Sequence, residues 1–187
     1  MKTMRNMIEG ATRLMFPPAA GARPSSGPSP IGRALQGMRR SALRNDAPVT
    51  ARKSSAQFLT GTFTNGAGSL DYKLFIPSAY CGRPLPMLVM LHGCKQDPDD
   101  FAAGTRMNEL AEERQCLVVY PAQAKRGNGL RCWNWFKAVN QQRDQGEPSM
   151  IAGVTRDVMH TFNADRRRVY SAGLSAGGAM AVIMGTT

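Results

Sequence analysis

The chain has 187 residues, of which 42% are hydrophobic and 20% are charged, so it is long enough for one folded domain with a sizeable core. Its net charge of +11 lies mainly at the N-terminus: residues 1–57 hold ten Lys/Arg and two Asp/Glu, which leaves +3 for residues 58–187. A basic tail binds phosphates without reading bases, so we expect no specific nucleic-acid recognition. No apolar run approaches the length of about 20 residues that spans a bilayer, so we expect no transmembrane helix.

Residues 1–57 are predicted to form a segment outside the folded domain. Residues 3–16 place apolar side chains at helical spacing, which favours a short basic helix that packs on the domain or, alternatively, binds an acidic or granule surface. Residues 17–30 are rich in proline, glycine and serine, a composition typical of a linker. Charged side chains interrupt the apolar positions of residues 3–16, so no secretory signal is recognised there.

The predicted domain, residues 58–187, alternates strands with helices. Strands are expected at 58–65, 70–76, 87–91, 116–120 and 168–172, the first two as a hairpin. One helix is expected after Asp97, which can cap it, with Pro98 at the first helical position. Its inner face consists of Phe101, Met107, Leu110 and Ala111. Another helix is expected to begin with Ser149 as its cap. This alternation indicates an α/β fold with a mostly parallel sheet and flanking helices.

The sequence Gly173-Leu174-Ser175-Ala176-Gly177 lies between the last predicted strand and an apolar helical run over residues 179–184. A Gly-x-Ser-x-Gly pattern alone is weak, but this strand–turn–helix setting is typical of a nucleophile elbow. In such a turn the serine hydroxyl is exposed above the sheet, and side chains at Gly173 and Gly177 collide with neighbouring backbone. We therefore predict Ser175 as a catalytic nucleophile for acyl transfer.

The sequence His92-Gly93-Cys94 follows the predicted strand 87–91. This is where an elbow-containing fold places the second half of its oxyanion hole, so we predict the backbone amides of Cys94 and Ala176 as the two oxyanion donors. His92 is either the general base or a residue that shapes the oxyanion loop through hydrogen bonds. The second interpretation is favoured because the chain order of the catalytic groups in this fold is Ser, Asp, His. His160 lies on the predicted helix that Ser149 begins, with Asp157 one turn back, and we expect a partly exposed helix residue rather than a member of a catalytic dyad.

Two tryptophans, Trp133 and Trp135, lie in a long predicted loop, residues 121–148, rather than on an apolar strand. Long loops without regular structure are often functional. Either tryptophan lines a cleft for an acyl group or polymer, or anchors the loop to the core, and both roles can coexist. The four cysteines lack the spacing of zinc ligands, so we expect no metal site.

Several separate segments, in the same order and spacing, resemble the poly(3-hydroxybutyrate) depolymerase family of esterases, which is related to feruloyl and acetylxylan esterases. They are MLVMLHGCKQDPDDFAAGTRMNELAEERQCLVVYPAQ, RCWNWF, QGEPSMIAGVTRDVM and DRRRVYSAGLSAGGAMA. The resemblance implies an α/β-hydrolase fold and cleavage of hydroxyalkanoate polyesters or oligomers by a Ser-His-Asp triad, without a cofactor or metal. By position, Ser175 matches the nucleophile and Cys94 and Ala176 the oxyanion donors. It also implies a loop near the site at Trp133–Trp135 and a disulfide between Cys94 and Cys132.

The Asp and His of the family triad have no match in this sequence and would follow residue 187. We therefore expect the N-terminal half of an α/β-hydrolase fold, inactive and only partly folded alone because an apolar strand edge would lack its partners. The alternatives are a feruloyl or acetylxylan type of carboxylesterase, or a non-catalytic remnant that binds a granule or acidic surface. The family implies secretion, whereas the lack of a recognised signal favours the cytoplasm. The sequence does not indicate an oligomeric state.

Overall fold

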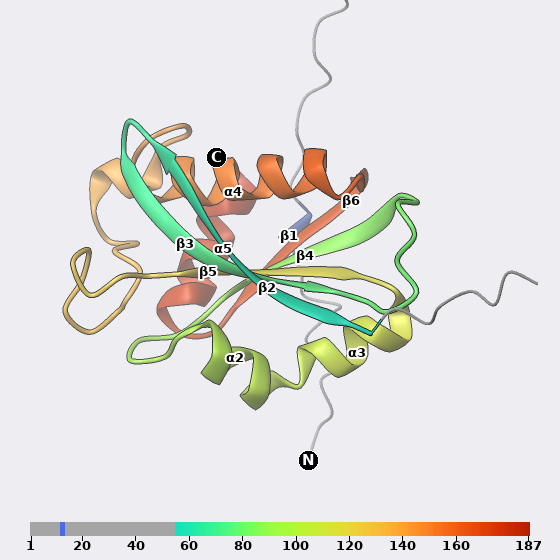
Figure 1. Ribbon diagram of the computed structural model, residues 1–187. Coiled ribbons are helices and arrows are strands. Elements are labelled where there is room, and N and C mark those ends of the chain that lie inside the picture. The colour runs from blue at the N-terminus through green and yellow to red at the C-terminus, as the bar shows by residue number, and fades with distance from the viewer. Residues whose placement is uncertain (1–11, 14–54) are drawn as a thin grey trace, which may run out of the picture. The chain divides into compact units, whose positions relative to one another are not determined.

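A computed structural model describes residues 12–13 and 55–187 of the chain (Figure 1). The predicted linker at 17–30 and most of the predicted helix at 3–16 lie outside these residues. Thr12–Arg13 form a two-residue strand, β1, and are therefore not helical. They pair antiparallel with Ser171 and Tyr170 at the edge of the sheet, where unpaired backbone groups favour an extended partner.

A mixed, twisted sheet forms the centre of the described domain (Figure 1). Its strands are β2 (Gln57–Asn65), β3 (Gly68–Ile76), β4 (Leu85–Leu91), β5 (Leu117–Ala122) and β6 (Ala164–Gly173), in the order β1-β6-β4-β5-β3-β2. β4 pairs in parallel with both β5 and β6, whereas the β2–β3 hairpin joins the sheet antiparallel to β5. The parallel strands β4 and β6 therefore end side by side at the same edge of the sheet.

Helices cover both faces of the sheet (Figure 1). They are α2 (Pro98–Thr105), α3 (Met107–Arg114), α4 (Gly146–Thr161) and α5 (Ala176–Thr186), with a 3₁₀ turn, η1 (Ala138–Gln141). Alternate residues of β4 enter different cores, because successive side chains of a strand point to opposite faces. Met87 and Val89 pack with residues of α4 and α5, and Leu88 and Met90 pack with residues of α2 and α3.

The helix predicted after Asp97 is two helices. Asp97 caps α2 as expected, and its Oδ1 accepts a hydrogen bond of 3.0 Å from the amide of Asp100. The chain then turns at Arg106, whose φ of 53° is left-handed, and α3 begins at the next residue. The Thr105 hydroxyl donates to the Phe101 carbonyl at 2.6 Å and so occupies an acceptor in the last turn of α2. The break leaves Phe101 and Met107 buried against the same face of the sheet.

The helix α4 begins three residues before Ser149, the predicted cap. Its start is stabilised by a residue from the preceding loop, because the Glu147 amide donates to Asn140 Oδ1 at 2.9 Å. Ser149 lies in the first turn, where its hydroxyl donates to the Gly146 carbonyl at 2.8 Å. The prediction of a Ser149 cap is therefore wrong, since a side chain outside the helix satisfies one of its free amides.

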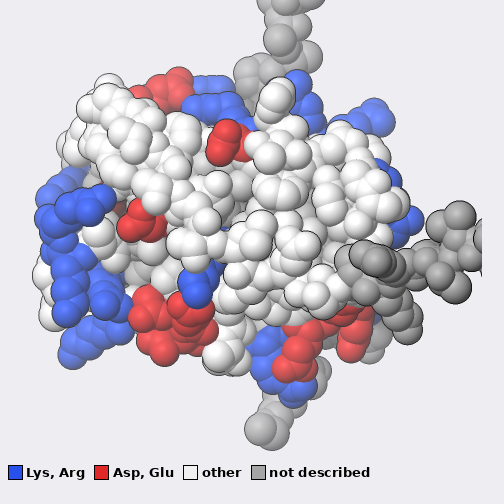
Figure 2. All heavy atoms as spheres, in the orientation of Figure 1, with Lys and Arg blue, Asp and Glu red and all other residues white. Residues whose placement is uncertain are grey.

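None of the helices within residues 55–187 is long and apolar enough to cross a membrane. Figure 2 shows one face of the molecule, on which charged side chains gather toward the margins and the centre is mostly uncharged. Lys and Arg side chains line the left margin of this face, and Asp and Glu side chains lie beside them toward its lower part (Figure 2).

Candidate active site

Ser175 occupies a strained turn between β6 and α5. Its backbone angles are φ 53° and ψ −120°, a conformation that non-glycine residues rarely adopt, and its side chain is exposed. The flanking glycines allow the turn to close: a Cβ at Gly173 would lie 2.3 Å from the Gly177 carbonyl oxygen, and a Cβ at Gly177 would lie 2.0 Å from the Leu91 carbonyl oxygen. The local sequence thus holds the hydroxyl of Ser175 above the end of the sheet.

The turn after β4 lies directly beside this serine. Leu91 is in register with Gly173 on the neighbouring strand, and an added Cβ at Gly93 would lie 3.7 Å from the Ser175 Cβ. The backbone amides of Cys94 and Ala176 donate to no other residue among those described. Ala176 begins α5, so its amide also lies at the positive end of the helix dipole. Each of the two neighbouring turns thus has one free backbone amide, that of Cys94 after Gly93 and that of Ala176 after Ser175.

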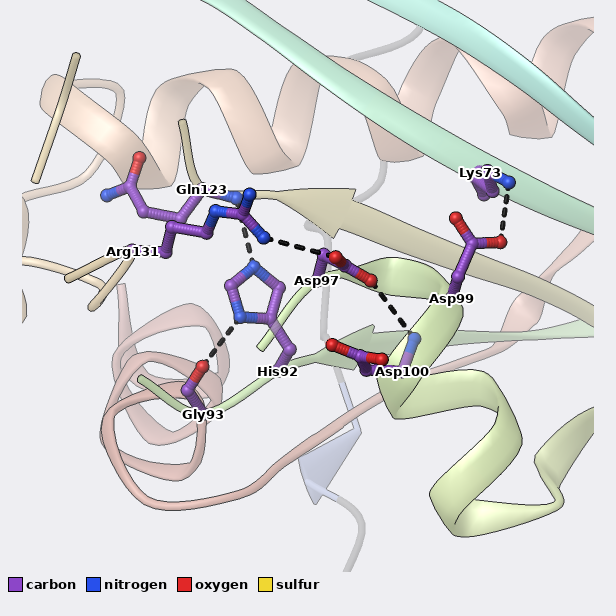
Figure 3. Close-up of polar contacts among 8 residues, drawn as sticks. All are labelled: Lys73, His92, Gly93, Asp97, Asp99, Asp100, Gln123 and Arg131. Atoms are coloured by element: carbon purple, nitrogen blue, oxygen red, sulfur yellow. Dashed lines mark hydrogen bonds and ion pairs between the residues drawn. The ribbon is translucent and has the colours of Figure 1, made fainter. Parts of the chain in front are cut away.

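The His92 side chain is fully buried and both of its ring nitrogens contact backbone groups (Figure 3). Nδ1 lies 2.8 Å from the Gly93 carbonyl oxygen, and Nε2 accepts a hydrogen bond of 3.0 Å from the Gln123 amide. Burial lowers the pKa of His92 below its usual value, against the opposing effects of the Gly93 hydrogen bond and of Asp97. With both nitrogens engaged, His92 is not placed to take a proton from Ser175.

His160, the other histidine of the chain, is exposed near the end of α4. No hydrogen bond or ion pair joins it to Ser175 within the described part of the chain. Neither histidine of this chain is therefore positioned as a general base for the serine.

The loop between β5 and α4 is fastened to the turn after β4 by a disulfide and a backbone hydrogen bond. Cys94 and Cys132 form a disulfide with a Cα–Cα distance of 4.2 Å, and the Lys95 amide donates to the Leu130 carbonyl at 2.7 Å. Arg131 of the same loop forms an ion pair of 3.1 Å with Asp97, the cap of α2 (Figure 3). The loop is thereby held next to the turn that carries the Cys94 amide.

The structure separates the two tryptophans of this loop. Trp133 is 0% exposed and its Nε1 donates to the His92 carbonyl at 3.1 Å, so it anchors the loop to the core. Trp135 is 43% exposed and packs edge-on against Phe136, which is also exposed, at 5.8 Å between ring centroids. Contact with a substrate is therefore retained as a proposal for Trp135 and not for Trp133.

A buried carboxylate that the sequence analysis missed organises the same loop. Glu147 accepts hydrogen bonds from the Gln123 side chain at 2.5 Å, the Asn134 amide at 2.8 Å and the Asn134 side chain at 2.6 Å. It is only 8% exposed. The stretch before it, residues 140–145, consists of polar side chains, a pattern that normally indicates an exposed acid, so no local signal marks Glu147 as buried.

The described residues contain no group of three His, Cys, Asp or Glu side chains that could hold a metal ion. Besides the disulfide pair, Cys81 is free and exposed, and Cys116 is free and partly buried. Burial raises the pKa of the Cys116 thiol to about 12, so this thiol stays protonated and unreactive at neutral pH.

Comparisons with known proteins identify a family and several relatives of this chain. The family described as "Esterase PHB depolymerase" matches residues 70–187. Poly(3-hydroxyalkanoate) depolymerase C of Paucimonas lemoignei is 32% identical over 79% of this chain and 36% of its own length, and feruloyl esterase B of Neurospora crassa is 28% identical over 74% and 46%. The fold is similar to that of an acetyl xylan esterase from Aspergillus awamori, with a TM-score of 0.60 at 21% identity over 70% of this chain and 46% of that one.

The chain spans between a third and a half of the length of these relatives. The family match covers more than half of the chain and includes both Ser175 and the turn after β4. The chain therefore belongs to the PHB depolymerase family of esterases, which are carboxylic ester hydrolases with an α/β-hydrolase fold.

Proposed function

We propose that this chain supplies the nucleophile and the oxyanion hole of a serine esterase. The observation that supports the proposal best is the exposed, strained Ser175 beside a turn with a free Cys94 amide, at the start of a helix with a free Ala176 amide. Donors placed where negative charge develops are the largest single contribution to many acyl transfers. The two amides stabilise the oxyanion after Ser175 has added to an ester carbonyl.

In the proposed reaction, Ser175 Oγ bonds to the carbonyl carbon and the hydroxyl proton leaves. The tetrahedral intermediate then collapses, the bond to the alcohol breaks, and the alcohol takes up a proton from water. Water hydrolyses the resulting acyl-enzyme in a second addition and collapse. Because neither His92 nor His160 is placed as a base, hydroxide accepts the proton in this chain by itself, so both acylation and deacylation are slow.

We propose short hydroxyalkanoate esters, such as those of polyhydroxybutyrate, as substrates. The depolymerase from P. lemoignei supports this class, and the exposed pair Trp135 and Phe136 offers an apolar contact on the loop that the disulfide ties to Cys94. Feruloyl or acetylxylan esters are the second candidate, because relatives named for those activities match over a similar part of the chain. Parallel assays with nitrophenyl 3-hydroxybutyrate, nitrophenyl acetate and methyl ferulate distinguish these classes.

The proposal is tested by trapping the acyl-enzyme. Incubation with nitrophenyl 3-hydroxybutyrate is expected to release one equivalent of nitrophenol in a burst, and mass spectrometry of a digest is expected to find the acyl group on Ser175. The burst rate should rise about tenfold per pH unit through pH 7 to 9, because hydroxide replaces a histidine base. Ser175→Ala abolishes the adduct, and Ser55→Ala, at another exposed serine, does not.

Two results would contradict this proposal. If the acyl group is found elsewhere, or not at all at pH 9, Ser175 is not the nucleophile. If the burst rate reaches a plateau near pH 7 that His160→Asn removes, a histidine of this chain acts as the base. Co-sedimentation with polyester granules that requires residues 1–57, without acylation of Ser175, would instead support a non-catalytic binding function.

A further inference from the structure

Most backbone polar groups in the turn after β4 have a hydrogen-bond partner. Trp133 Nε1 donates to the His92 carbonyl at 3.1 Å, and Gln96 Oε1 accepts from the Gly93 amide at 2.8 Å. The Gly93 carbonyl lies 2.8 Å from His92 Nδ1 (Figure 3). Of the consecutive groups from the His92 carbonyl to the Cys94 amide, only the Cys94 amide has no partner among the described residues.

The planarity of the peptide bond connects these contacts to the candidate oxyanion hole. The Gly93–Cys94 peptide is trans, so its carbonyl and its N–H point in opposite directions. A bond that holds the Gly93 carbonyl on the His92 ring therefore also directs the Cys94 N–H away from that ring. The Gln96 amide also donates to the Gly93 carbonyl, at 3.4 Å, so the His92 contact of 2.8 Å is the shorter of two bonds to this oxygen. Gly93 has no Cβ and both of its rotatable bonds are soft, so loss of the shorter bond lets the peptide rotate and withdraw the amide.

The hydrogen-bond partners also determine which nitrogen of His92 carries the proton. The Gln123 amide can only donate, so Nε2, which it contacts at 3.0 Å, is unprotonated. The single ring proton then lies on Nδ1 and is donated to the Gly93 carbonyl. The charged groups near the ring are Asp97 and Arg131, which are paired with each other at 3.1 Å. The Trp133 ring packs against the imidazole with 5.6 Å between centroids.

We propose that His92 is a positioning residue, which in its Nδ1-protonated form holds the Gly93 carbonyl and thereby aims the Cys94 amide at the oxyanion. This inference rests on the proposed function of Ser175 and Cys94. It assigns to His92 no proton transfer with the substrate. Protonation of Nε2 would place two N–H groups face to face between His92 and Gln123 and disturb the turn.

Two substitutions separate this role from simple packing. In His92→Asn, the side-chain NH₂ is the same number of bonds from Cβ as Nδ1, so it can still donate to the Gly93 carbonyl. In His92→Phe the ring remains and the donor is lost. His160→Phe is the matched control, because that histidine is exposed and contacts neither turn.

The measurement is the affinity of each variant for butylboronic acid by calorimetry. Ser175 Oγ adds to boron, the hydroxyl proton leaves to solvent, and the tetrahedral boronate anion places an oxygen against the two amides, so no general base is needed for the equilibrium. His92→Phe is expected to weaken binding about 10²- to 10³-fold, the usual effect of losing one oxyanion donor. His92→Asn is expected to remain within about threefold of the wild type, as is His160→Phe.

Equal affinities of the wild type and His92→Phe would overturn the role of His92, as would equal losses in His92→Phe and His92→Asn. A wild type that binds no better than Ser175→Ala would instead overturn the proposed function itself. If His92→Phe does not fold, ¹⁵N NMR of the wild-type imidazoles decides: a ring protonated on Nδ1 up to high pH supports the proposal, and one protonated on Nε2 overturns it. His160 provides an exposed histidine for comparison in the same spectrum.

Discussion

The disulfide between Cys94 and Cys132 is expected to contribute strongly to stability and weakly to the reactivity of Ser175. It closes a loop with a sequence separation of 38 residues. In the chain-entropy treatment, a loop of that length restricts the unfolded state by about 4 kcal/mol at 25 °C. We therefore predict that the double variant Cys94→Ser/Cys132→Ser loses about 2–4 kcal/mol of unfolding free energy, the lower value allowing for residual structure in the unfolded chain.

The assay is guanidinium unfolding followed by tryptophan fluorescence, since Trp133 is buried beside the disulfide. Cys81→Ser, at an exposed free thiol, is the control and should change the unfolding free energy by less than about 0.5 kcal/mol. The loop keeps its contacts through Glu147 and Trp133 without the disulfide, so the acylation rate of Ser175 should fall less than about tenfold. A double variant as stable as the wild type would refute the entropic argument, and one that is stable but a thousandfold slower would show that the disulfide itself places the oxyanion loop.

Three further predictions concern single residues. Glu147→Gln should lower the free energy of unfolding in urea by about 2–4 kcal/mol, because an amide NH₂ then faces buried donors whose hydrogen bonds the carboxylate accepts in the wild type. An unchanged urea midpoint would contradict the role of this hydrogen-bond network. Gly177→Ala should cost at least about 2 kcal/mol and suppress acylation, because its Cβ would lie 2.0 Å from a backbone oxygen; Gly66→Ala, at an open position, is the control. Because the pKa of His92 is lowered in the folded chain, the unfolded chain takes up a proton on this ring at higher pH than the folded chain does. The contribution of His92 to the free energy of unfolding should therefore be constant above pH 7 and decrease as the pH falls below about 6.5. His92→Asn should remove that part of the pH dependence, and an identical pH dependence in the variant would contradict it.

The features that sequence analysis anticipated are local ones. The hairpin of β2 and β3 pairs Asn65 with Gly68 and so turns at Gly66-Ala67, as the glycines there indicated. The Asp97 cap depends on residues only three positions apart, and the turn at Ser175 depends on glycines two positions away on either side. In each case one short segment contains both partners of the interaction, so its pattern is readable without knowledge of the fold.

The features that were missed depend on partners outside the element concerned or on backbone conformation. α4 begins at Gly146 because Asn140, from the loop, satisfies its first turn, and no capping pattern within the helix reveals this. The break at Arg106 needs a left-handed backbone conformation, which arginine rarely adopts, and the sequence has no glycine at this position to indicate it. Which tryptophan is buried depends on the path of the loop over the core, and the sequence around Trp133 and Trp135 does not distinguish the buried one from the exposed one.

The arrangement of the site follows from the topology more than from any one motif. β4 and β6 are neighbours in the sheet but are separated by more than 70 residues in the chain, and their parallel pairing brings Leu91 opposite Gly173. The turns that follow these two strands therefore emerge side by side, one with Gly93 and the other with Ser175, and this brings the turn with the free Cys94 amide next to Ser175 and the free Ala176 amide. Neither turn places a histidine as a base for Ser175, because His92 lies in the turn after β4 and both of its ring nitrogens contact backbone groups there. The same contacts that make His92 suitable for holding the Gly93 carbonyl thus prevent it from acting as the base.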